Sequence, residues 1–175
     1  MELTAHAGIG WLLAEAGMAD DRFRRMVFLA AVLPDLDAVP LVFGYSEAHH
    51  MWTHNLLFSL LVSTVAAVYC RQYRIRSFAF TQLAFYSHYF GDYFFTQWPL
   101  TFFWPFSTHG FVSKHAYSYF SRINESLELA SLIVIALLAV IFKRTPLEVL
   151  SPWLDHKFTD AIREAVGKPF RTKKK

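Results

Sequence analysis

The chain has 175 residues, which is enough for one domain with a core and too few to expect two. Hydrophobic residues make up 54% of it and charged residues 18%, whereas an average soluble domain has roughly 45–50% and about 25%. A lipid-facing surface explains this composition, with its 18 Phe, 8 Tyr and 5 Trp, better than a water-soluble core does. The net charge of +3 is modest and clustered, which indicates membrane topology rather than nucleic-acid binding.

The first predicted helix covers residues 3–16, where apolar side chains recur at helical spacing, and it contains His6. Gly17 and the acidic pair Asp20-Asp21 indicate the end of this helix and the start of the next.

Two aspartates directly follow an apolar run at residues 26–33 that stops at Pro34. Proline disfavours helix at the residue before it, so Asp35 and Asp37 are expected at or just past a helix end. A polar turn in which one aspartate caps the next element would explain the pair without a function.

Two further apolar segments flank the basic loop RQYRIR. Residues 55–70 carry no charge. As a helix with a rise of about 1.5 Å per residue they would cover roughly 24 Å, whereas the hydrocarbon core of a bilayer is about 30 Å thick. Flanking residues must therefore contribute to the span, or the bilayer must thin. Residues 78–95 are rich in aromatic side chains and contain His88 and Asp92.

The last apolar helix is expected at residues 126–142, closed by Lys143-Arg144. A loop at residues 97–110, rich in proline and tryptophan, precedes it and is expected to form an interfacial aromatic belt. A short amphipathic helix at 156–166 follows, and the terminal lysines indicate a topology signal or a contact with anionic lipid.

Together these segments predict an all-α, membrane-embedded helical bundle with about 4–5 apolar or transmembrane helices at residues 1–145 and a basic, partly amphipathic C-terminal tail at 146–175. If the basic flanks stay cytoplasmic, the chain is a multi-pass cell-membrane protein with a cytoplasmic C-terminus. The opposite helix ends then share one face. On that face lie Asp35, Asp37, His49, His50, His54, His88, Asp92, Glu125 and Glu128.

The spacing of histidines and aspartates favours a metal site. His88 and Asp92 are four residues apart, so a helix presents both on one face. His49, His50 and His54 fall within six residues, and neutral imidazole is the commonest metal ligand. A His–Asp hydrogen bond inside an apolar helix and an interfacial histidine cluster are the alternative interpretations. The remaining histidines are expected in loops or on the surface, namely His109, His115 and His156.

Four motifs resemble the membrane-bound, metal-dependent hydrolase family, whose members are also described as LexA-binding, inner-membrane-associated hydrolases. These motifs are TAHAGIG at 4–10, LPDLD at 33–37, HHMWTHN at 49–55 and SHYFGD at 87–92. The resemblance covers residues 3–110 and implies a site made of His6, Asp35, Asp37, His49, His54, His88 and Asp92. His50, Met51 and Asn55 stand where the family has Arg, Gly and Ser.

The chain is more distantly similar to zinc-dependent phospholipase C, an all-helical enzyme with ligands in the order His, Asp, His, then HxxxD. This similarity implies that Asp35 and His49 join His88 and Asp92 around a principal ion, with His6 beside a second. We therefore expect one or two divalent ions, zinc or alternatively manganese.

An open position on such an ion lowers the pKa of a water from 15.7 to about 7, which supplies hydroxide at neutral pH. We expect a metal-dependent hydrolase of the inner membrane that acts on a lipid-like or membrane-proximal ester or phosphoester, with Asp37 as general base or as the group that orients a histidine. Two alternatives stay open: a non-catalytic membrane protein whose structural or regulatory metal site serves a protein partner, and an ion or proton conduit. Direct nucleic-acid binding is not expected.

Overall fold

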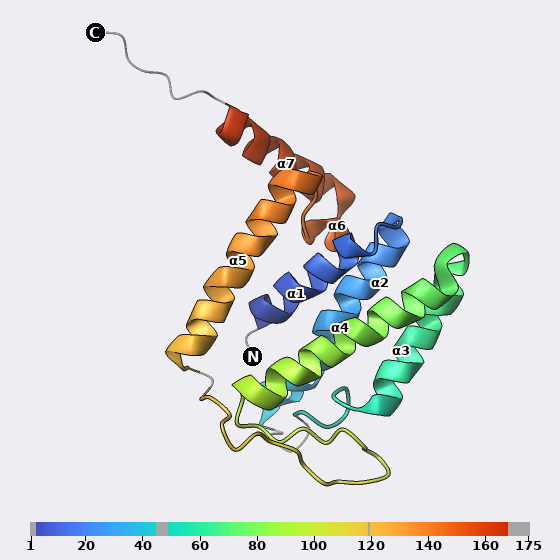
Figure 1. Cartoon of the computed structure of the whole chain (residues 1–175), viewed down its shortest axis with the longest axis vertical. Coiled ribbons are helices and arrows are strands. Elements are labelled where there is room, and N and C mark those ends of the chain that lie inside the picture. Colours follow the sequence, from blue (N-terminus) through green and yellow to red (C-terminus); the bar gives the residue numbers. More distant parts are fainter. Residues whose placement is uncertain (1–2, 45–48, 119, 168–175) are drawn as a thin grey trace.

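The computed structural model describes residues 3–44, 49–118 and 120–167, and within them the regular elements are helices apart from one antiparallel bridge between Leu100 and Phe111. The all-α prediction is therefore confirmed for these ranges. In chain order (Figure 1) the elements are α1 (Leu3–Ala16), α2 (Asp21–Val32), the 3-10 helix η1 (Leu33–Phe43), α3 (Leu56–Tyr69), the 3-10 turn η3 (Arg71–Tyr73), α4 (Arg74–Phe95), α5 (Arg122–Phe142), α6 (Leu147–Leu150) and α7 (Pro152–Gly167).

Short polar side chains start three of the helices. Asp20, Asn55 and Ser121 each accept a hydrogen bond from a backbone N–H three residues further on, which satisfies a donor that the first helical turn leaves free. Helix α2 ends just before Pro34, and the chain continues as η1, which carries both aspartates. The expected position of Asp35 and Asp37 just past a helix end is confirmed.

Helix α1 lies at the centre of the packing, against α2, α4 and α5. Small residues permit the close approach. A Cβ on Gly10 would lie 2.3 Å from the Cβ of Ala31 on α2, and one on Gly8 would lie 2.7 Å from the Cβ of Ser131 on α5. Glycine at these two positions therefore brings the three helix backbones together, as small residues do in membrane bundles.

Helices α3 and α4 form a hairpin that turns through 111° at the basic segment between them, and they lie side by side (Figure 1). Buried polar groups join them, because the Gln82 side-chain amide donates to Ser63 Oγ at 3.0 Å. The N-terminal end of α3 and the C-terminal end of α4 consequently both lie at the end of the bundle away from the turn.

Among the described residues, one helix is long and apolar enough to cross a membrane. This is α5, which has 21 residues, and its most apolar 18-residue stretch has a mean hydropathy of 2.2 with 11% of that stretch buried. Helices α3 and α4 give a second candidate if the bent pair is counted as one span. The prediction of 4–5 apolar or transmembrane helices exceeds this number. Helices α1, α2 and α3 have 14, 12 and 14 residues, and each is shorter than the roughly 20 that a span requires.

A buried ion pair attaches the C-terminal region to the bundle. The Arg24 guanidinium on α2 donates to both carboxylate oxygens of Glu148 on α6, at 3.0 and 3.1 Å. Asp155 on α7 accepts hydrogen bonds from Thr145 N and Oγ1, both at 2.7 Å. These contacts fix α6 and α7 against the ends of the longer helices.

The first prediction concerns this ion pair. Glu148→Gln removes the buried carboxylate that accepts from Arg24 and leaves Arg24 with Asp21 and with Glu15 at 3.7 Å, so the cost should be at most the roughly 3 kcal/mol of breaking a fully buried pair from one side. We expect a clearly lower melting temperature in detergent. The matched control is Glu125→Gln, which removes a charge from an exposed position in the first turn of α5 and should change stability by less than about 1 kcal/mol. Equal melting temperatures for both variants would contradict the role given to the pair.

Candidate metal centre

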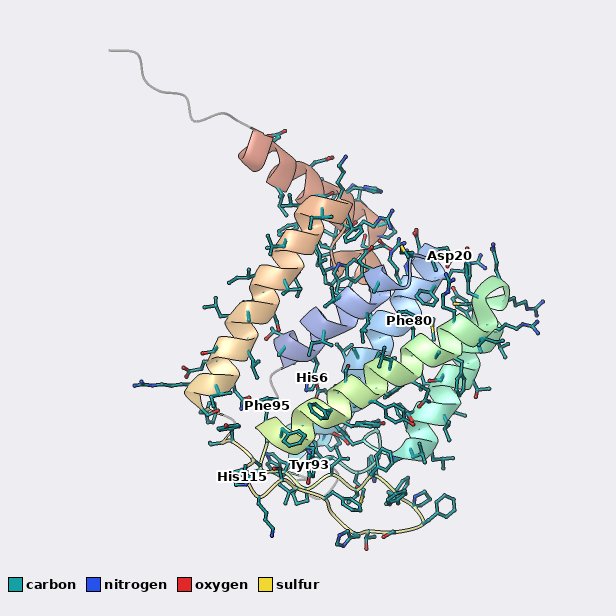
Figure 2. The ribbon with its side chains drawn as sticks, viewed as in Figure 1. His6, Asp20, Phe80, Tyr93, Phe95 and His115 are labelled. Carbon is teal, nitrogen blue, oxygen red and sulfur yellow. The ribbon has the colours of Figure 1, made fainter. Side chains whose placement is uncertain are left out.

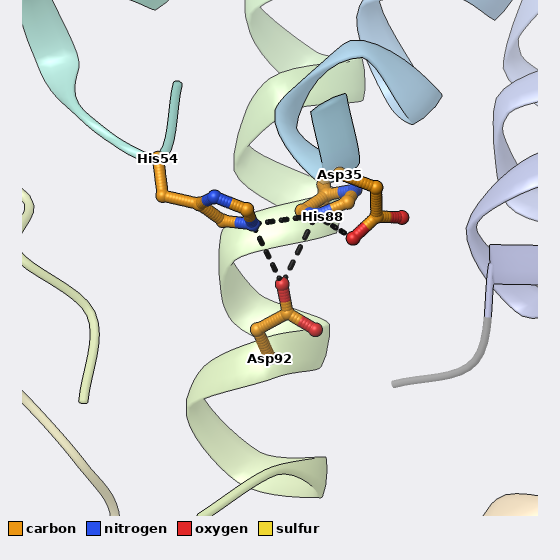
Figure 3. A group of neighbouring side chains, drawn as sticks. All are labelled: Asp35, His54, His88 and Asp92. Atoms are coloured by element: carbon orange, nitrogen blue, oxygen red, sulfur yellow. Dashed lines mark hydrogen bonds and ion pairs between the residues drawn. The ribbon is translucent and has the colours of Figure 1, made fainter. Parts of the chain in front are cut away.

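Four side chains from three parts of the fold converge (Figure 3), two of them near the C-terminal end of α4, away from the α3–α4 turn. Asp35 comes from η1, His54 from the segment before α3, and His88 and Asp92 from α4. One ligand atom of each lies within 4.8 Å of the others.

The shortest separations join the two histidines to Asp92. His54 Nε2 lies 3.1 Å from His88 Nε2 and 3.2 Å from Asp92 Oδ2, and His88 Nε2 lies 3.0 Å from the same oxygen. Asp35 Oδ1 is 3.7 Å from His88 Nε2. The four candidate metal-ligand atoms, called donors below, thus surround one point.

Outer hydrogen bonds turn both imidazoles toward that point. His88 Nδ1 lies 2.7 Å from the backbone oxygen of Ala31, which can only accept, so Nδ1 carries a proton and Nε2 faces the centre. His54 Nδ1 donates in the same way to Asp37 Oδ2 at 2.8 Å. Carboxylates that hold the far nitrogen of an imidazole are typical of histidines that ligate metals.

The carboxylates of the centre favour a positive charge on His54, whereas burial lowers the pKa of His6 to about 4 and that of His50 to about 3. Burial opposes protonation of His54, but its hydrogen bonds to Asp37 and Asp92 outweigh burial and raise its pKa to about 9. Burial likewise opposes ionisation of Asp37, yet the hydrogen bonds from His49 and His54 hold its pKa well below the usual range. A cation at this point, whether a proton or a metal ion, is therefore stabilised by the surrounding carboxylates.

The donor set fits a divalent ion. Zinc bonds of about 2.0–2.2 Å in tetrahedral geometry place neighbouring donors about 3.3 Å apart. Four of the six separations, at 3.0–3.2 Å and 3.7 Å, lie around that value, and the other two, from Asp35 to His54 and to Asp92, are at most 4.8 Å. Two imidazole nitrogens and two carboxylate oxygens suit zinc or manganese.

His6 lies beside the cluster rather than within it. Its Nε2 is 3.1 Å from Asp92 Oδ1, and its ring stacks on that of His88 with centroids 3.6 Å apart. Figure 2 shows His6 between α1 and α4, at the same end of the bundle as Tyr93 and Phe95. Asp92 therefore has one oxygen in the four-residue cluster and the other at His6.

Of the two neighbouring histidines, neither belongs to the four-residue cluster, and the role of His49 as a ligand stays a prediction. His49 Nδ1 lies 3.0 Å from Asp37 Oδ1, so His49 contacts the outer carboxylate and is not in the cluster. His50, whose role the sequence left open, places Nε2 3.7 Å from Asp92 Oδ2, and its Nδ1 donates to the backbone oxygen of Trp98 at 3.3 Å. Residues 49–55 are not helical, and His50 has a left-handed φ of 59°, so helical spacing could not assign these side chains.

The other candidates lie outside the cluster. Glu128 accepts a hydrogen bond from Thr4 Oγ1 at 3.0 Å, which joins α5 to α1. Glu125 is exposed. His109, His115 and His156 are exposed, as expected for loop or surface histidines.

Access to the centre is uneven. His54, His88 and Asp92 are almost completely buried, whereas the Asp35 side chain is 23% exposed. Apolar residues on the same 3-10 helix, Leu36 and Val39, are each 53% exposed. The 3-10 helix that carries the one partly open candidate ligand therefore also exposes large apolar side chains.

A family model described as YdjM inner membrane protein matches residues 1–154. The chain belongs to the YdjM inner membrane protein family. The matched range contains all four residues of the cluster, and the expectation of an inner-membrane family is confirmed. No curated protein and no solved structure matches this YdjM-family chain, and its similarity to the hydrolase family and to phospholipase C stays a prediction.

The second prediction is that the YdjM-family centre binds zinc through His54. His54→Ala removes one of four donors, and its loss of affinity should exceed the roughly 10–100-fold that follows from changing an outer partner such as Asp37. Metal content after purification and zinc titration in detergent measure the effect. His115→Ala, at an exposed histidine, is the control and should bind zinc as the unchanged protein does. Equal affinities in the two variants would rule out His54 as a ligand.

Proposed function

We propose that the chain is a membrane-bound, metal-dependent hydrolase that cleaves an ester or phosphoester of a lipid-like substrate. The observation that carries the proposal is the convergence of four donors around one point, with three of them buried and Asp35 partly open. Sites with this mixture of buried and accessible ligands permit both tight metal binding and substrate approach. One or two ions, zinc or manganese, are the proposed cofactors.

Each residue has a distinct part in this proposal. A bound ion would polarise a substrate oxygen and lower the pKa of a water. His54, His88 and Asp92 would hold the ion from the buried side. Asp35 would complete the set at the partly exposed side.

Asp37 is best placed as an orienting residue. Its Oδ1 accepts from His49 Nδ1, and its Oδ2 accepts from His54 Nδ1 and from the backbone N–H of Met51 at 3.2 Å. Both oxygens are thus engaged and the side chain is 2% exposed or less, which favours orientation of His54 over the alternative of a general base.

The proposed substrate class rests on the apolar surface of η1 and on the family. Leu36 and Val39 expose apolar side chains on the same 3-10 helix as Asp35, and the family is one of inner membrane proteins. An amphiphile could place its apolar part on these residues and its ester or phosphoester beside Asp35. A small polar ester would gain nothing from the apolar surface.

One observation favours a second candidate function. A structural zinc site is closed by four protein ligands, and the cluster supplies four donors. In that case the ion would stabilise a fold that binds a protein partner without catalysis.

The third prediction separates these two functions. Asp37→Asn keeps the four donors but loses the carboxylate that fixes the His54 tautomer, so metal should still bind at saturating concentration while turnover falls by about 10–100-fold. Zinc content and hydrolysis of chromogenic esters and phosphodiesters, short-chain and long-chain, provide the measurements. Zinc-loaded protein without activity on any of these substrates, together with strong thermal stabilisation by zinc, would favour the structural site.

The proposed orientation places the basic helix ends in the cytoplasm and the metal centre toward the opposite face. Arg22 lies in the first turn of α2, Arg71 begins η3, and Lys143 follows the end of α5. These three helix ends lie away from the metal centre. Basic residues remain on the cytoplasmic side of bacterial-type inner membranes.

The fourth prediction tests this orientation. A reporter active only in the cytoplasm should give signal when fused after Lys175 and none when inserted at His109 in the loop between α4 and α5. Immunoblots of both fusions control for expression. The reverse pattern would invert the orientation, and signal from both sites would contradict a membrane-crossing α5.

A further inference from the structure

Helix α7 lies at the C-terminal end of the candidate span. It contacts α5 and crosses the end of that helix (Figure 1). Because α5 is apolar up to Phe142 and Lys143-Arg144 follow, this end marks the level at which the chain would leave the hydrocarbon core. Helix α7 is therefore placed at a membrane surface rather than across the membrane.

One face of α7 is attached to the protein. Asp155 and Thr159 are 3% and 4% exposed, and Asp155 accepts both hydrogen bonds from Thr145. The Arg24–Glu148 pair holds the preceding turn α6. Rotation of α7 about its axis is restricted by these buried contacts.

Apolar side chains on α7 point away from this attachment. Trp153, Leu154 and Phe158 are 60%, 42% and 51% exposed. Leu154 and Phe158 are four residues apart and so share one side of the helix. A soluble protein rarely leaves such a group of large apolar side chains in water.

Two observations indicate that lipid covers this face. First, α7 contacts α5, the candidate membrane span, whose Leu137 and Ile141 side chains are 57% and 65% exposed. Second, the Lys157 ammonium lies 4.1 Å from the centre of the Trp153 ring, and tryptophan and lysine are both typical of the headgroup region. The sequence beyond α7 ends in Lys173-Lys174-Lys175, which favours anionic lipid.

We propose that α7 is an interfacial helix that lies in the plane of the membrane, with Leu154 and Phe158 inserted at the boundary between headgroups and acyl chains on the basic side of the protein. The partner is the lipid bilayer itself. This role is independent of the metal centre, because Figure 2 shows His6, which contacts Asp92, away from α7.

The fifth prediction uses the fact that Cys70 is the chain's single cysteine. In a Cys70→Ala background, Leu154→Cys and Phe158→Cys each carry a fluorescent label on the apolar face. His156→Cys is the matched control on an exposed position of the same helix. The full-length protein is reconstituted into vesicles of phosphatidylcholine and phosphatidylglycerol. Quenching by brominated acyl chains and by aqueous iodide is then measured for each label.

We expect brominated lipid to quench the labels at 154 and 158 several-fold more than the label at 156, and iodide to show the opposite order. Two positions on the apolar face guard against a local disturbance by either label, and circular dichroism confirms that each variant is helical. Equal exposure to iodide at all three positions would overturn the proposal. Protection of 154 and 158 from both quenchers would also overturn it, because a protein and not lipid would then cover the face.

Discussion

The need to balance buried negative charge governs how this protein is built. Asp37 and Asp92 lie almost completely out of water, and Asp35 is only partly open. Carboxylates in an apolar bundle are stable only when cations or hydrogen-bond donors surround them. The imidazoles of five histidines meet this need from α1, α4 and the segment before α3, so the polar contacts at this end determine where the helix termini can lie.

The bundle has a second polar cluster at its other end, and the two differ in chemistry. There the Arg24 guanidinium supplies a permanent positive charge to Glu148, with Glu15 3.7 Å away. An arginine remains charged at any physiological pH, so this cluster is complete without an ion. At the histidine end the charge depends on a proton or a metal, and this difference separates a structural joint from a site capable of binding.

Much of this arrangement could be predicted from sequence. Helical periodicity and the proline at position 34 locate the segments. The basic residues at one end of each segment then place the candidate ligands together at the other end, namely Asp35, His54, His88 and Asp92. Spacing on a helix correctly pairs His88 with Asp92, because both lie on α4. The same reasoning does not reach His49 and His50, because their segment is an irregular turn in which backbone conformation, not periodicity, directs each side chain. The count of spans also could not be read from apolar content, because short helices in a bundle bury one face against each other.

The order of the ligands along the chain has a consequence for biogenesis. The cluster draws on residues that enter the growing chain as early as Asp35 and as late as Asp92, with His6 earlier still. During synthesis the four donors cannot surround one point until the α3–α4 hairpin has formed and folded back against α2. Helix α5, by contrast, contributes no donor to the cluster. The four side chains can thus converge once the first four helices are complete, before the arrival of α5 and the C-terminal segment.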